Sequence, residues 1–493
     1  MKTSLCYQNF TSPSFGVISY FLKPKKHIPR KNIHETIIKS NYSINIFGLN
    51  IRNLRFLRHV QYDFFFFLIA CAPKNTTQRD SFDLVWNTVN TTFPYEDFQT
   101  LDWNSVYKEL KPKADKAQSS TELRPILRDM LSRLQLSHYS IIAQEQYTPA
   151  QQPDRTEHPL QTDHVALNNQ KMLGWNGIEG RWIEQQLIVT KVSSPAKELG
   201  VQTGWIITDV SRRSTAEFVD TLHSSQHQKS LDIGLFIQFH SYNLVNTTKN
   251  FGFLDHNDQP RSLDLPYQTG EGVIAELANY PPVLVRFSHE QREDNIDIIA
   301  FNSFMMPIRP RIIDAFQKIA QTQPKGLIID LRGNLGGLIG LGSGLAGHIF
   351  SESGKSLGAQ ITRSGTMFFQ IKPQSRRVRY DGPVAILIDE LSVSTSEILA
   401  GGLQELKRAR LFGQKTPGKA LPSIITQLPN GDRFQYVISD LKTPSGKRYE
   451  GEGVIPDVII SPSRKDYLEK HDPTLEAACS WILKQNSFQK DQP

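Results

Sequence analysis

Three serines in one short segment are the residues of this chain best suited to chemistry. Residues 391–398 read Leu-Ser-Val-Ser-Thr-Ser-Glu-Ile, and the serines are Ser392, Ser394 and Ser396. The segment lies between the apolar run 384–388 and a helical apolar pattern, so it is predicted to be a strand-to-helix turn. A serine at such a turn presents its hydroxyl beside the exposed N–H groups of a helix N-terminus, which can bind an oxyanion. The segment therefore predicts a serine nucleophile.

The same serines also have a purely structural interpretation. Ser394-Thr-Ser-Glu397 matches the Ser-x-x-Glu capping box, in which the serine and the glutamate satisfy the free N–H groups of a helix start. Taken by itself, this motif favours a cap over a nucleophile. Ser392 and Ser396 are the alternative positions for the nucleophile.

A nucleophilic serine needs a base, and Lys419 is the candidate in the same part of the chain. It lies 25 residues after Ser394, and the neighbouring residues 417, 418 and 420–422 carry no competing charge. A lysine acts as a base only if desolvation lowers its pKa toward neutrality. The alternative interpretation is an exposed lysine without a catalytic role.

The elements around these residues follow an α/β pattern from residue 283 onward. Buried strands are predicted at 296–301, 326–331 and 384–388, because each is a nearly continuous apolar run. Helices are predicted around 312–319, 338–349, 398–406 and 474–484 from their apolar spacing. The sequence Leu428-Pro-Asn-Gly-Asp-Arg433 predicts a hairpin turn between two further strands.

The preceding part of the chain is predicted to contain three different segments. Residues 80–145 show helical spacing, and 146–165 are polar and typical of a linker. Residues 170–266 are β-rich: a strand, a short helix from Ser194-Pro-Ala, a glycine and another strand resemble a PDZ domain, with Gly204-Trp205 in place of the usual Gly-Asp. PDZ domains bind a peptide C-terminus by adding it to a sheet edge. A module used only for packing is the alternative.

Composition excludes several classes of protein. The chain has 493 residues, 39% of them hydrophobic, and a mean hydropathy of −0.38, which excludes a polytopic membrane protein. Of the net charge of +7, about +8 lies in residues 1–70, so no basic patch remains to indicate a nucleic-acid partner. Three cysteines cannot form a disulfide scaffold, and no Cys/His spacing indicates zinc. We therefore expect no metal and no cofactor.

The first 71 residues are predicted to be a leader. Arg52, Arg55 and Arg58 precede an apolar run at 64–70 that ends in Ala70-Cys71, an order that resembles a bacterial lipoprotein signal. Cys71 would then carry a lipid and place the protein in the cell envelope of a bacterium, in the periplasm or at the outer membrane. No other contact with a membrane is expected. The alternative is a buried apolar strand with a chance cysteine.

Five ordered motifs make residues 80–480 resemble the tail-specific, or C-terminal processing, protease family. They are the segments 330–337, 391–398, 413–419, 443–446 and 453–457. The resemblance implies a ClpP/crotonase-like α/β core at 281–493, a PDZ-like domain at 166–280 and a helical N-terminal domain with linker at 72–165. It also implies a serine endopeptidase whose polypeptide substrate is recognised at its C-terminus.

The resemblance assigns roles to individual residues. Ser394 stands at the position of the nucleophile and Lys419 at that of the usual base. The oxyanion would be held by the backbone N–H of Gly336 or Gly337 together with that of Thr395.

Two departures leave the base open. Ser423 stands where the family often has a glutamine, and the surrounding residues are closer to a branch in which the lysine can be replaced. Tricorn-type relatives have a Ser-His pair before the PDZ-like module, which is Ser137-His138 here, and Glu450 matches their glutamate. His138 is thus the second candidate base, although the spacing within the core favours Lys419. A non-catalytic peptide-binding protein and an apolar-ligand binder on the same fold are the alternative functions.

Overall fold

The computed structural model describes residues 76–93, 101–146, 173–222, 226–270, 272–277 and 279–490. The chain divides into two compact units, Met1–Pro73 and Lys74–Pro493, and all described residues belong to the second. No helix within the described ranges is long and apolar enough to cross a membrane. The predicted leader with Cys71 and nearly all of the predicted linker lie outside the described residues.

A six-stranded sheet forms the centre of the second unit. Its order is β12-β13-β14-β17-β18-β22, and all neighbours run parallel except β12, which is antiparallel to β13. The strand β17 is apolar along its length, and β14 is apolar up to its last residue, Asp330, because both faces of the sheet are covered. The bounds are Phe287–Gln291, Ile296–Phe301, Gly326–Asp330, Val384–Ile388, Arg410–Gly413 and Val458–Ile459.

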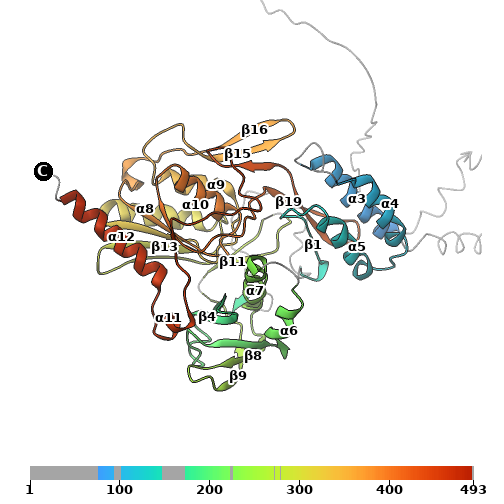
Figure 1. Ribbon diagram of the computed structural model, residues 1–493, viewed down its shortest axis with the longest axis horizontal. Helices are drawn as coiled ribbons and strands as arrows, with labels where there is room; N and C mark the ends of the chain where they lie inside the picture. The colour runs from blue at the N-terminus through green and yellow to red at the C-terminus, as the bar shows by residue number, and fades with distance from the viewer. Residues whose placement is uncertain are drawn as a thin grey trace, which may run out of the picture. The chain divides into compact units, whose positions relative to one another are not determined.

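Helices cover the two faces of this sheet (Figure 1). Residues of α8, Ile308–Thr322, α9, Ile339–Gly347, and α10, Thr395–Glu405, share one hydrophobic core with one face. Residues of α12, Pro473–Lys490, pack on the other face. The predicted strands and helices of this α/β part are thereby confirmed, with shifts of a few residues at their ends.

Three smaller sheets surround this core. One has the order β16-β15-β21, one pairs β10 with β11, and one has the order β1-β20-β19. The hairpin β19–β20 lies where the Asn-Gly turn predicted it. In chain order the bounds are β1 Ser140–Ile142, β10 Val273–Ala275, β11 Val283–Val285, β15 Ser356–Thr362, β16 Gly365–Gln370, β19 Ser423–Gln427, β20 Arg433–Val437 and β21 Asp440–Lys442, with the 3₁₀ turns η3 Gln144–Gln146 and η6 Arg376–Val378.

A β-rich module occupies residues 173–266. Its main sheet has the order β3-β4-β5-β8-β9, with β6 beside β5, and β2 pairs separately with β7. Helix α7, Gln226–His240, packs against the edge strand β3. The other bounds are β2 Leu173–Trp175, β3 Ile178–Ile183, β4 Gln186–Val192, β5 Ile206–Val210, β6 Arg213–Ser214, α6 Thr215–Asp220, β7 Tyr242–Leu244, β8 Thr248–Leu254 and β9 Pro260–Pro266.

Three helices precede this module: α3 Thr76–Thr92, α4 Trp103–Ala114 and α5 Ser120–Ser132. Their apolar faces form a core of their own, which also includes Leu428 and Phe434 of the β19–β20 hairpin. The helical segment predicted at 80–145 is therefore confirmed as far as Ser132, but Ser140–Ile142 form the strand β1 instead of a helix. The helices pack against a hairpin more than 290 residues away in sequence.

A second prediction is also wrong. The Ser194-Pro-Ala segment forms consecutive tight turns instead of a helix, with hydrogen bonds from Glu198 to Pro195 and from Leu199 to Ala196. A single α-type hydrogen bond, from the Lys197 N–H to the Ser193 carbonyl at 3.0 Å, is not followed by a second one, so no α-helix propagates. A short helix found late in the chain is α11, Arg464–Leu468. The four-part domain division and the ClpP/crotonase-like description of the core stay predictions.

Candidate active site

Ser394 lies at the start of α10, in the turn that follows the central strand β17. Its backbone has φ +60° and ψ −116°, a left-handed conformation that is costly for a residue with a side chain, about 1–3 kcal/mol. The packing around it enforces this geometry: a Cβ on Gly336 would lie 2.7 Å from the Ser394 Cβ. The chain thus holds this serine in a strained turn at the carboxyl edge of a parallel sheet.

The other two serines of the segment are part of its internal structure. Ser392 and Ser396 are fully buried, whereas Ser394 is partly exposed. The Ser392 hydroxyl donates to the Leu331 carbonyl at 2.8 Å, and the Ser396 hydroxyl donates to the Asn334 carbonyl at 2.8 Å. These bonds tie the turn to the loop after β14 and leave Ser394 as the accessible hydroxyl of the three.

The glycine pair predicted to bind an oxyanion lies directly beside Ser394. A Cβ on Gly336 would lie 2.9 Å from the Thr395 nitrogen, so these two backbones adjoin. The Gly336 N–H, however, donates to the Asn334 Oδ1 at 2.9 Å, so in this structure Gly336 does not offer it to a substrate.

The Gly337 and Thr395 N–H groups have a different environment. Among the described residues neither has a recorded acceptor. The Gly336 carbonyl accepts from the Phe304 N–H at 2.8 Å, and because the peptide bond is trans and planar, the Gly337 N–H points to the opposite side. Of the two glycines, the geometry leaves Gly337 to act with Thr395.

The predicted residues from the helical segment and from the core meet in one cluster. His138 Nδ1 lies 2.7 Å from the Ser137 Oγ, and that hydroxyl donates to the Glu450 Oε2 at 2.8 Å. The Ser137 N–H donates to the other Glu450 oxygen at 2.6 Å. The Glu450 Oε2 also accepts from the Ala420 N–H at 3.2 Å, next to Lys419. The predicted residues Ser137 and His138 are therefore brought next to Lys419 and Glu450, and Ser137 and Glu450 are more than 300 positions apart in sequence.

The electrostatics of this cluster favour a neutral imidazole. Burial, together with the nearby Lys419 ammonium, lowers the pKa of His138 to about 4. Burial also raises the pKa of Glu450, while its hydrogen bonds from Ser137 and the Lys419 charge oppose that shift. At neutral pH the His138 ring is thus unprotonated and able to accept a proton.

Glu397 is the residue of the site whose importance the sequence did not reveal. Its carboxylate is fully buried and accepts from the Ser394 N–H at 3.0 Å and from the Lys419 N–H at 2.8 Å. Burial raises its pKa to about 7 against the effect of these donors. The capping-box motif indicated the first contact, but no sequence signal indicated the second. Asn334, which orders the glycine loop, was also missed because a lone asparagine carries no motif.

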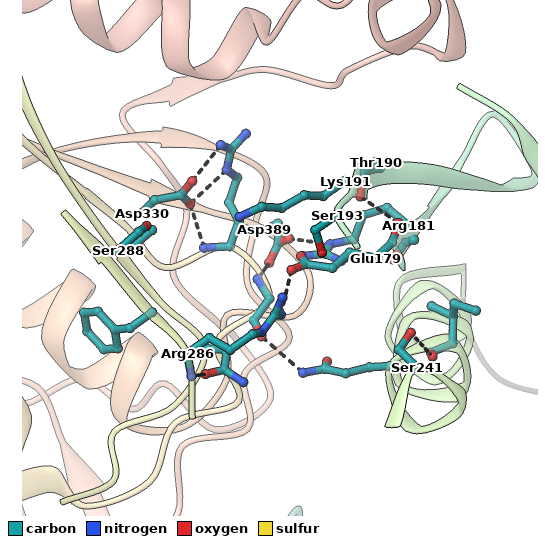
Figure 2. Close-up of a pocket in the computed structure, with 18 of the residues that line it drawn as sticks. Glu179, Arg181, Thr190, Lys191, Ser193, Ser241, Arg286, Ser288, Asp330 and Asp389 are labelled. Carbon is teal, nitrogen blue, oxygen red and sulfur yellow. Dashed lines mark hydrogen bonds and ion pairs between the residues drawn. The ribbon is translucent and has the colours of Figure 1, made fainter. Parts of the chain in front are cut away.

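A cavity of about 930 Å³ lies between the β-rich module and the carboxyl ends of the central strands (Figure 2). Several ion pairs line it, among them Arg181 Nε to Asp389 Oδ2 at 2.7 Å and Arg286 Nη2 to Glu179 Oε1 at 2.7 Å. Burial opposes ionisation of Glu179, but the charges of Arg286, Lys191 and Arg181 lower its pKa to about 2. The cavity is therefore strongly charged, and Ser394 is not among its lining residues.

Comparisons with known proteins agree with this architecture. Residues 295–460 match the family model of peptidase family S41, and residues 75–132 match that of the tricorn protease C1 domain. A "Probable CtpA-like serine protease" of Staphylococcus aureus strain N315 is 29% identical over 170 residues, 34% of each chain. One of the same description from Staphylococcus epidermidis is 24% identical over 359 residues, 72% of this chain and 64% of that protein. The alignments thus span about a third to two thirds of these bacterial relatives.

Solved structures share the fold at low sequence identity. The photosystem II D1 C-terminal processing protease aligns with a TM-score of 0.50 at 18% identity, over 78% of this chain and 94% of that one. Mature CPAF aligns with a TM-score of 0.55 at 12% identity, over 85% and 99%. Together with the family match over the strands, glycine loop and serine turn described above, these findings show a peptidase family S41 region at residues 295–460 and a similarity of the chain to C-terminal processing proteases.

Proposed function

We propose that the protein is a serine endopeptidase that cleaves polypeptides with Ser394 as its nucleophile. The observation that carries this proposal is the strained, partly exposed Ser394, held between Gly336 and the N-terminus of α10. Its hydroxyl attacks the scissile carbonyl, and the negative charge that develops on the oxygen is stabilised by the N–H groups of Gly337 and Thr395. The bacterial relatives and the family match support the same activity.

His138 is the base that the contacts support best. The hydrogen bonds from Ser137 to Glu450 fix the orientation of the imidazole, as a third group orients the base in other serine hydrolases. Lys419 is the second candidate, because its backbone N–H and that of Ser394 share one carboxylate. With His138 as the base, burial and the Lys419 charge keep the imidazole unprotonated before the attack.

The substrate is proposed to be recognised at its C-terminus by the PDZ-like module. Among the strands that the structure describes, the edge strand β3 pairs only with β4, so a peptide can add to its other side where the cavity lies. Arg286 of the core reaches the same cavity, stacks 4.0 Å from the Trp175 ring and has a buried Nε without a recorded acceptor in the described structure. A terminal carboxylate fits this guanidinium.

The charged lining of the cavity argues against one of the two alternative functions, an apolar-ligand binder. An apolar-ligand binder would need an apolar cavity, and the ion pairs of Arg181 and Arg286 give no such surface. A non-catalytic peptide binder shares the module but does not account for the strained serine turn. A lipid on Cys71 and a location in the bacterial envelope stay part of the proposal on sequence grounds alone.

Cleavage of an unfolded protein by purified wild type and Ser394→Ala tests the activity. Removing one partly exposed oxygen leaves the fold intact, so we expect a loss of about a thousandfold or more in rate with an unchanged circular dichroism spectrum. Retained cleavage by a folded Ser394→Ala variant would end the assignment.

A further inference from the structure

The Glu397 carboxylate joins two segments of the site. Oε2 accepts from the N–H groups of Ser394, at 3.0 Å, and Lys419, at 2.8 Å. Oε1 accepts from the Thr416 hydroxyl and the Gly418 N–H, each at 2.7 Å. One of the four donors belongs to the serine turn, and three belong to the segment that carries Lys419.

A helix cap alone does not require these contacts. The capping box of α11 provides a comparison within the same chain, because Asp466 accepts from the N–H and the hydroxyl of Ser463, both at 2.7 Å. Both of those donors belong to its own N-cap residue. Three donors of Glu397 instead lie 19 to 22 residues away in sequence.

The segment held by Glu397 also touches the carboxylate behind His138. Directly after Lys419, the Ala420 N–H donates to Glu450 at 3.2 Å, and Glu450 accepts from the Ser137 hydroxyl that contacts His138. Residues 416–420 therefore donate to two carboxylates, to Glu397 next to the nucleophile and to Glu450 next to the Ser137-His138 pair.

We propose that Glu397 is a positioning residue that sets the separation between the Ser394 hydroxyl and the proton-accepting group. It fixes Lys419 directly, and it fixes His138 through Ala420, Glu450 and Ser137. The inference rests on the proposed peptidase activity but does not depend on which base accepts the proton. Because proton transfer requires hydrogen-bond distance, a displacement of this segment by about 1 Å costs about a hundredfold in rate.

Glu397→Gln tests the connection that Glu397 makes between the serine turn and residues 416–419, with little change in side-chain volume. A glutamine presents one NH₂ group to a pair of donors, so either the serine turn or the Thr416 segment loses its acceptor. We expect kcat for a short peptide to fall about 10- to 100-fold with KM within about twofold, and labelling of Ser394 by a fluorophosphonate to slow by a similar factor. Asp466→Asn is the matched control in the other capping box, and both constants should stay near the wild-type values.

Thr416→Val separates positioning from capping, because it removes one donor and leaves the Ser394 contact intact. Thr416 is fully buried, and its hydroxyl also accepts from the Val454 N–H at 2.7 Å. We expect a fall in kcat of about 3- to 10-fold, and Thr416→Ser, which keeps the hydroxyl, should restore it.

The results distinguish a failure of the proposed peptidase activity from a failure of the positioning role of Glu397. If the wild type does not cleave, the peptidase activity fails. If the wild type cleaves and Glu397→Gln retains kcat within about twofold, the positioning role is overturned. Should Glu397→Gln not fold, the Thr416 pair decides: equal kcat for Thr416→Val and Thr416→Ser contradicts the role, and a selective loss in Thr416→Val supports it.

Discussion

At the scale of single residues, the site depends on how each polar group is already engaged. Ser392 and Ser396 resemble Ser394 in sequence, but their buried hydroxyls are used to tie two loops together. Gly336 and Gly337 are likewise equivalent in sequence, and only the backbone contacts distinguish them. The chemical role of each residue in this turn therefore depends on whether its hydroxyl or N–H group is already engaged in a hydrogen bond.

The base is tested by the pH dependence of cleavage. A base must be unprotonated to accept a proton, so with the His138 pKa near 4 we expect kcat/KM to fall only below about pH 4 to 5 and to be level above it. His138→Gln should lose about 10²- to 10⁴-fold. A lysine base would instead give a rate that rises toward alkaline pH and is abolished in Lys419→Arg, because guanidinium stays protonated.

Glu450→Gln gives an independent check on the base. It removes the carboxylate that orients Ser137 and, through it, the His138 ring. The account is wrong about the base if His138→Gln and Glu450→Gln both cleave at near the wild-type rate while Lys419→Arg does not.

Ser396→Ala should affect stability instead of chemistry. Its fully buried hydroxyl donates to Asn334, and the loss of a buried hydrogen bond costs about 1–3 kcal/mol. We expect a lower melting temperature and a kcat of the folded enzyme within about twofold of wild type. A thousandfold loss of kcat at an unchanged melting temperature would instead move the nucleophile to Ser396.

At the scale of elements, the sequence predicts what local patterns determine. The strands at 296–301 and 384–388 match the structure to the residue. The second is a continuous apolar run, and the first is apolar except for Asp297, so both have clear ends. The Ser194-Pro-Ala turn was missed because its hydrogen bonds include contacts with residues distant in sequence, such as the Ala196 N–H to the Asn176 carbonyl, which helical propensity does not describe. The contact between Ser137-His138 and Glu450 could be proposed only from resemblance, since no local pattern encodes a pairing across 313 positions.

The helical segment is attached to the core through a buried ion pair at the β19–β20 hairpin. Arg124 donates to Asp432 at 2.8 and 3.0 Å, and Asp432 is fully buried. Arg124→Met leaves this carboxylate without its cation, so we expect a loss of about 3–5 kcal/mol in unfolding free energy. Activity should fall as well, because the segment carries His138.

Arg133→Met is the control for this attachment. Arg133 pairs with Glu109 at 2.7 Å within the helical segment, and both side chains are partly exposed. An exposed pair contributes about 0–1 kcal/mol. Equal effects of the two substitutions in urea denaturation would show that the Arg124 contact has no special structural weight.

At the scale of the whole molecule, the β-rich module contacts the loop, residues 389–393, that leads to the serine turn. Arg181 of β3 pairs with Asp389, and a Cβ on Gly234 of α7 would lie 2.8 Å from the side chain of Leu391. The charged cavity is therefore lined in part by this loop, through Asp389. The proposed recognition site and the proposed nucleophile thus adjoin the same short segment.

Recognition of a terminal carboxylate predicts a preference among substrates. A peptide with a free C-terminus should be cleaved about tenfold more efficiently than its amidated form, since a charge-assisted hydrogen bond to Arg286 is lost on amidation. Arg286→Gln should reduce this ratio toward one without abolishing cleavage. Equal kcat/KM for the two peptides with the wild type would contradict C-terminal recognition.

The most direct measurement of the central claim is to locate the nucleophile chemically. The native protein is treated with a fluorophosphonate, digested, and mapped by mass spectrometry, with a heat-denatured sample as the control. The account predicts one stoichiometric adduct on Ser394 that is absent from the denatured sample, because only the folded turn activates the hydroxyl. An adduct on Ser392 or Ser396, or no adduct on a native protein that cleaves its substrate, would contradict it.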